Sequence, residues 1–126
     1  MTETEVKNLL QDLVKKKIWY EILVECYGNK DGNQGSREER KRRLEIQIDI
    51  IEKSINVLSE EEKFIVSKHL IDGKRWKDTL AAYVEVFGKD RERSERTLKR
   101  IQKRAIGKMT KMLGKQDIEE WINGET

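Results

Sequence analysis

Phosphate binding is the chemistry that this sequence is best equipped for, because its positive charge is concentrated in one stretch. Residues 89–111 contain ten Lys and Arg residues against three Asp and Glu residues, a local charge of +7, whereas the rest of the chain sums to −4. Ammonium and guanidinium groups bind phosphate oxygens, and a dense cationic stretch attracts polyanions. A solvated charged helix is the simpler interpretation, but the concentration of charge favours a polyanionic partner.

An apolar seam predicts that a single helix carries most of these charges. The seam residues recur at three- and four-residue spacing, as on one face of a helix: Leu98, Ile101, Ala105, Met109 and Met112. Ser94 precedes the seam as a potential N-cap. We therefore expect a helix over about residues 95–113 that packs through the seam and turns its basic side outward.

The basic side divides into two sets if this helix enters the major groove of DNA. Its first turns would reach base edges, and the candidates there are Glu95, Arg96, Lys99 and Arg100. Phosphate contacts give affinity without a sequence code, and the candidates for them are Arg91, Arg93, Lys103, Arg104 and Lys108.

Composition indicates an all-α protein. The 126 residues include no proline, where average usage predicts about six, and 40% of them are charged against 36% hydrophobic. Strong helical periodicity of the apolar residues argues against disorder. No apolar run reaches the roughly 18 residues that span a membrane, and residues 1–10 lack the features of a signal peptide. We therefore expect a cytoplasmic protein that does not bind membranes.

Catalytic and metal sites are not expected. His69 is the only histidine and Cys26 the only cysteine, so a histidine-based triad, a zinc site and an intramolecular disulfide all lack partners. The three tryptophans, Trp19, Trp76 and Trp121, each lie in an apolar stripe and are expected to anchor the core. The sequence predicts no enzyme and no cofactor.

Residues 1–57 are expected to form an N-terminal helical hairpin. One helix is predicted over about 4–27 and a second over about 37–57, separated by a glycine-rich loop at 28–36. The second helix carries a heptad seam whose members are candidates for self-association: Leu44, Ile48, Ile51 and Ile55. This seam fits either the inside of the hairpin or a homo-oligomer contact, since a second stripe predicts two neighbours for this helix.

Residues 58–114 are expected to form a trihelical helix-turn-helix domain, followed by a short tail at 115–126. The first of its helices opens with a capping box at Ser59 and Glu62 and stops at Gly73. The second spans about 75–87, and the basic helix is the third. Trihelical DNA-binding units use this layout.

The stretch from Leu58 to Leu113 resembles region four of bacterial sigma factors. It is more similar still to the phage-encoded ArpU/RinA-type transcription regulators that share that helix-turn-helix. Four segments carry the resemblance, which covers just under half of the chain: residues 58–63, 71–76, 94–100 and 104–109. Two features depart from the family pattern. The connection at 86–94 is longer, and Thr79 stands where isoleucine or leucine is usual unless Leu80 takes that place.

The resemblance implies a sequence-specific DNA-binding transcription regulator of phage or prophage type, acting in a bacterial host cell. It would bind double-stranded promoter DNA, with contact to RNA polymerase as a further implication. One alternative is a phage small terminase subunit, which also couples such a fold to helical oligomerisation. Another is a helical protein-interaction module that binds RNA polymerase or another regulator without DNA contact, which the acidic remainder and the heptad seam favour.

Overall fold

The protein is all-helical in the computed structural model, which describes residues 1–25, 34–88 and 94–115. The side chains of residues 34–36 lie outside this description, and the described parts contain no strand. Five of the α-helices, from the N-terminus, are α1 (Glu3–Gln11), α2 (Leu13–Glu25), α3 (Gln34–Ile55), α4 (Glu60–Ile65) and α5 (Trp76–Phe87). A π-helical segment, η1 (Val66–Ile71), continues α4, and the basic helix is α6 (Glu95–Leu113). The prediction of an all-α protein is confirmed.

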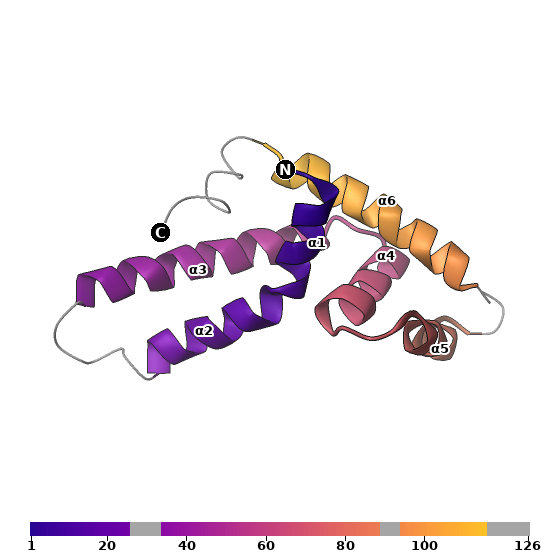
Figure 1. The fold of residues 1–126 in the computed structure, drawn as a ribbon, viewed down its shortest axis with the longest axis horizontal. Helices are drawn as coiled ribbons and strands as arrows, with labels where there is room; N and C mark the ends of the chain where they lie inside the picture. The colour runs from indigo at the N-terminus through magenta and orange to yellow at the C-terminus, as the bar shows by residue number, and fades with distance from the viewer. Residues whose placement is uncertain (26–33, 89–93, 116–126) are drawn as a thin grey trace.

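The first predicted helix is divided in two at Asp12, so the prediction of one helix over residues 4–27 is wrong. Asp12 has φ −89° and ψ −2°, and its N–H still donates to the carbonyl of Asn8. Aspartate is a weak helix former because its side chain competes for backbone hydrogen bonds. The direction changes here, so that α1 packs on α6 while α2 runs beside α3 (Figure 1). A single straight helix could not make both contacts.

The capping signals of the sequence operate as expected. Ser59 accepts from the N–H of Glu62 at 3.3 Å, and the Glu62 carboxylate accepts from the N–H of Ser59 at 2.8 Å, which makes a reciprocal capping box. Ser94 accepts from the N–H of Thr97 at 3.2 Å and starts α6. Gly73 has φ +70° just beyond η1, a conformation that favours glycine.

A large apolar cluster joins the two ends of the chain. It fixes the C-terminal half of α6 against α1, α3 and η1, and its buried members are Val6, Leu10, Leu13, Ile51, Leu58, Val66, Leu70, Ala105, Ile106, Met109 and Leu113. The domain boundary predicted at 57/58 falls between α3 and α4, but this cluster takes residues from both sides of it. Figure 1 accordingly shows α1 lying against α6.

A second, aromatic cluster fixes the N-terminal half of α6. Its buried members are Ile65, Tyr83, Leu98 and Ile101, with Phe64, Trp76, Leu80 and Phe87 packed around them. The Tyr83 hydroxyl donates to the Glu61 carboxylate, which satisfies its polar end. The cluster therefore binds α5 to α4 and α6.

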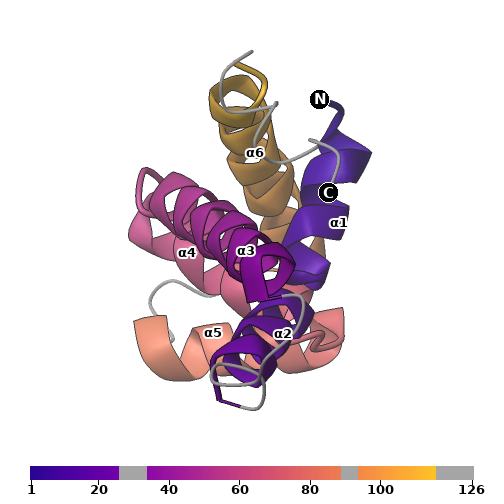
Figure 2. The ribbon, with the colours of Figure 1, turned by 90° about the vertical axis from the view of Figure 1, so that its left-hand side faces the viewer.

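The helices α2 and α3 extend away from the body formed by α4, α5 and α6. Figure 1 shows the pair projecting to one side, and Figure 2 shows α3 and α2 nearest the viewer when that side is turned forward. Lys16 donates to the buried Gln47 side chain at 3.0 Å across the two helices.

Candidate nucleic-acid interface

The basic side of α6 is open to solvent along its whole length. All four candidates for base contact are exposed, namely Glu95, Arg96, Lys99 and Arg100. The phosphate candidates Lys103, Arg104 and Lys108 are exposed as well, whereas Arg91 and Arg93 lie outside the described residues. Six of these seven described side chains are cationic, so the exposed charge of these candidates is predominantly positive.

Four of the five residues of the predicted apolar seam on α6 are buried in the core, and the fifth, Met112, is partly buried. Leu98, Ala105 and Met109 have no exposed surface, and Ile101 retains 6%. The aromatic cluster holds the first turns and the large apolar cluster holds the remainder. Because both halves are packed, the basic side chains project from a helix whose orientation in the body is fixed.

Lys108 differs from its neighbours because a buried carboxylate engages its ammonium group. Lys108 Nζ donates to Glu62 Oε1 at 2.9 Å, and the Glu62 side chain is only 2% exposed. The second oxygen, Oε2, is buried without a hydrogen-bond partner among the described residues. A buried charge needs a partner, so Lys108 contributes to the fold at a position where a phosphate contact was also predicted.

The protonation of Glu62 depends on this pair. Burial raises the pKa of Glu62, but the hydrogen bond from Lys108 and those from the Ser59 backbone and hydroxyl outweigh burial, so the pKa is lower than usual. The carboxylate form is thus favoured, and Glu62 links the start of α4 to the middle of α6.

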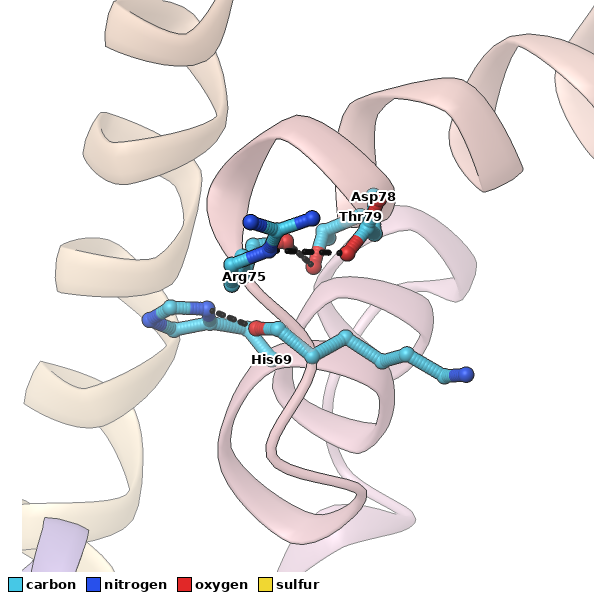
Figure 3. Close-up of polar contacts among 5 residues, drawn as sticks. His69, Arg75, Asp78 and Thr79 are labelled. Carbon is cyan, nitrogen blue, oxygen red and sulfur yellow. Dashed lines mark hydrogen bonds and ion pairs between the residues drawn. The ribbon is translucent and has the colours of Figure 1, made fainter.

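A second group of basic residues begins α5. Lys74, Arg75 and Lys77 are exposed, and Arg75 Nε donates to Asp78 Oδ2 at 3.2 Å (Figure 3). This helix has no side-chain N-cap, and three cations at its start are unfavourable to the helix dipole. These cations are therefore better placed to bind a negatively charged partner than to stabilise α5 itself.

Trp76 connects this group to α6. The His69 ring stacks on Trp76 with centroids 3.7 Å apart, and Lys99 Nζ lies 6.0 Å from the Trp76 ring centroid. His69 is held in turn by a 2.8 Å hydrogen bond between Nδ1 and the carbonyl of Lys74 (Figure 3). The basic start of α5 and the first turns of α6 consequently lie on adjoining surfaces.

Lys74, Arg75 and Lys77 are not among the site residues predicted from the sequence. The available signal was a run of basic residues directly after Gly73, where acidic residues would favour the helix dipole.

Thr79 occupies a core position of α5 without an exposed atom. Its hydroxyl donates to the carbonyl of Arg75 at 2.9 Å, one turn earlier (Figure 3), so the polar group is satisfied within the helix. Leu80 is only partly buried beside it, within the aromatic cluster. Thr79 itself therefore takes the inward place, and no shift of register to Leu80 occurs.

The predicted self-association seam on α3 is largely used inside the chain. Ile51 is fully buried in the large cluster, and Ile48 and Ile55 pack against it from partly buried positions. Leu44 is also partly buried. Packing within one subunit accounts for most of this seam, and self-association through it remains a prediction.

In the described ranges, no helix is both long and apolar enough to cross a membrane. The same residues contain no cluster of three or more His, Cys, Asp or Glu side chains that could hold a metal ion. Comparison with known proteins assigns no family to this chain, since no protein-family model, no curated protein and no solved structure matches it.

Proposed function

We propose that this protein binds double-stranded DNA by placing the exposed side of α6 in the major groove, and that it acts as a transcription regulator. One observation carries the proposal: α6 buries its apolar seam and exposes five cationic side chains that no buried carboxylate engages, Arg96, Lys99, Arg100, Lys103 and Arg104, whereas the sixth candidate, Lys108, is paired with Glu62. The major groove, about 12 Å wide, admits one helix. Such a surface supplies both phosphate contacts and base-edge donors.

The arrangement of the preceding helices supports this mode of binding. The helices α4 and α5 pack on the buried side of α6 through the aromatic cluster, so they support the helix without covering its basic surface. We assign to them the scaffold role in the proposed helix-turn-helix. The exposed cations at the start of α5 extend the positive surface beyond α6 and would contact the phosphate backbone.

A transcriptional role rests on the resemblance of residues 58–113 to sigma region four and to phage regulators. A small terminase subunit would use the same surface on DNA. The protein-interaction alternative is favoured by a different observation, the exposed apolar side chains of α2, which include Trp19 at 59% exposure and Ile18 at 51%. DNA binding separates this protein-interaction alternative from the transcription regulator and the terminase subunit, both of which bind DNA.

Salt dependence of duplex binding tests the proposal. If about six phosphates are neutralised, affinity should fall by about 10³-fold between roughly 50 and 200 mM salt. Fluorescence anisotropy with a labelled duplex measures this slope. A chain that binds no duplex at low salt would instead be the protein-interaction module.

Sequence selectivity should depend on the first turns of α6. Arg96→Ala or Arg100→Ala is expected to weaken binding to the preferred site by about 1–3 kcal/mol, because arginine can bond guanine through two donors. Binding to random duplex should weaken much less. The measurement is a pair of anisotropy titrations, after selection of the preferred site from a random library.

Lys111→Ala is the matched control, since Lys111 is exposed on the last turn of the same helix. It should reduce affinity by the same factor on both duplexes. Equal losses for the Arg96 and Arg100 variants on both duplexes would make these residues phosphate contacts and contradict the prediction.

A further inference from the structure

The outward face of α2 exposes apolar side chains that nothing in the described chain covers. Val14 is 44% exposed and Ile18 is 51% exposed, while Ile22 continues the row from a partly buried position. These three residues recur every four positions, so they form one ridge along the helix. Trp19, beside the ridge, is 59% exposed. The expectation that Trp19 anchors the core is therefore wrong.

This ridge faces away from the rest of the molecule. The inward side of α2 is occupied by α3, through buried Leu13 and Leu23 and the Lys16–Gln47 hydrogen bond. Figures 1 and 2 show no other labelled helix lying along α2. Most of the exposed large apolar side chains of the described residues belong to α2. Such clustering marks an interaction surface.

The charges on one flank of the ridge, Lys17 and Glu21, are complementary to the same two charges on a second α2 helix that runs in the opposite direction. Lys17 and Glu21 lie on the same flank of α2, one turn apart. Between α2 and α3 this flank borders a groove of about 440 Å³, in which Lys17 is the only cation and the carboxylates are Glu21, Glu45, Asp49 and Glu52. Lys17 Nζ lies 3.5 Å from Glu52, but both side chains are about half exposed, so this pair is weak. The Glu21 carboxylate can therefore still pair with a cation from outside the subunit.

A second copy of α2, packed antiparallel, supplies that charge. With a two-fold axis at the level of Trp19, positions 17 and 21 are equally far from the axis. Lys17 of each copy then lies level with Glu21 of the other, and the contact occurs twice, as an isologous interface requires. At 1.5 Å per residue, the ridge side chains of the second copy fall about 3 Å along the axis from those of the first, so the ridges interdigitate.

We propose that the chain forms a two-fold dimer through antiparallel packing of α2 on α2 of a second copy. Val14, Ile18 and Ile22 make the apolar centre of the contact, and the Lys17–Glu21 pairs fix its direction. This inference does not depend on DNA binding, because it concerns α2 and not the basic side of α6.

Charge exchange between two variants tests the proposal on the full chain without DNA. Lys17→Glu alone and Glu21→Lys alone each place like charges opposite each other twice, and each should weaken dimerisation by about tenfold or more. In an equimolar mixture, the carboxylate introduced at position 17 of one chain meets the ammonium group introduced at position 21 of the other. In the second contact, Glu21 of the first chain meets Lys17 of the other, as in the wild type. Dimers that contain one chain of each variant should therefore form. Sedimentation velocity gives the mass, and native mass spectrometry with one variant labelled with ¹⁵N gives the composition.

Ile18→Asp provides an independent arm. Because Ile18 is half exposed in the monomer, the variant should keep wild-type helicity by circular dichroism while sedimenting as a monomer. Lys17→Glu also removes the ion pair of Lys17 with Glu52 within its own chain. Mixing the two variants does not restore that pair, so its loss cannot explain the return of dimers on mixing. A monomeric wild-type chain at tens of micromolar, a dimeric Ile18→Asp variant, or a mixture no more associated than its components would overturn the proposal.

Discussion

Reversing two charges on α6, by Lys103→Glu with Arg104→Glu, is expected to abolish duplex binding at moderate salt. Both side chains are exposed next to the buried seam. Each change removes one phosphate contact and adds a repulsion, so affinity should fall by at least about a hundredfold. Gel-shift and anisotropy assays measure the loss. Circular dichroism should remain that of the wild type, because no core contact is changed.

The matched control for this charge reversal is Lys7→Glu with Lys53→Glu. These lysines are exposed on α1 and α3, so the double variant makes the same change in net charge without altering a side chain of α6. Lys53 loses only an exposed ion pair with Asp49, in which the charged atoms are 3.0 Å apart. It should retain most of the affinity. If the α6 variant bound DNA as well as the wild type, the binding surface would lie elsewhere. The next candidate is the basic stretch near the start of α3, which contains Arg37, Arg40, Lys41, Arg42 and Arg43.

Loss of the Lys108 ammonium is expected to be the most destabilising single change on the basic side of α6. Lys108→Met leaves the Glu62 carboxylate buried without its ion partner. We expect the free energy of unfolding to fall by about 2–3 kcal/mol, below the range for a fully buried pair because Lys108 is half exposed. Urea denaturation measures this difference. Lys111→Met, at an exposed site on the same helix, should change stability little.

A second substitution separates the buried charge from other effects of Lys108. Glu62→Gln removes the charge, and glutamine can still serve as the third residue of the capping box. The Lys108→Met/Glu62→Gln double variant should therefore recover most of the lost stability. A double variant as unstable as Lys108→Met would show that the loss has another source, such as packing of the lysine stem.

The pH dependence of the same pair follows from the direction of the shift. The pKa of Glu62 is lower in the folded state than in the unfolded chain. The stabilisation of the folded state by the ionised Glu62 carboxylate is therefore complete above the pKa of the unfolded chain, about 4.3. It is lost as the pH falls through the lower, folded value. Urea denaturation at a series of pH values should therefore show a larger stability difference between wild type and Lys108→Met near neutral pH than in acid, because the difference narrows as the pH falls.

Local signals predicted the elements of the fold where they were strong. The bounds of α6 match because Ser94, a regular seam and Gly114 all mark the same helix. The capping box at Ser59 likewise marks the start of α4. Signals of this kind act within a few residues, so they can be recognised in a sequence.

Features that depend on tertiary packing could not be predicted in this way. The apolar stripe of residues 4–27 continues past Asp12, a weak helix former, and the bend at this residue allows α1 to pack on α6 while α2 packs on α3. A helix that is apolar on several sides does not reveal which side its neighbours cover, which is why Trp19 was assigned to the core. The partnership of Glu62 with Lys108 spans 46 residues and has no local signal at all.

The packing of α1 on α6 also constrains how the protein is made. Val6 and Met109 belong to the same cluster although nearly the whole chain separates them. During synthesis α1 emerges before α6, so the part of its apolar face that packs on α6 lacks that partner until α6 has been translated. Contacts between distant residues form slowly, and unfinished chains expose aggregation-prone surface. A prematurely terminated product that lacks α6 would lack four members of this cluster, Ala105, Ile106, Met109 and Leu113. Part of its apolar surface would then stay exposed, which favours its removal by quality control.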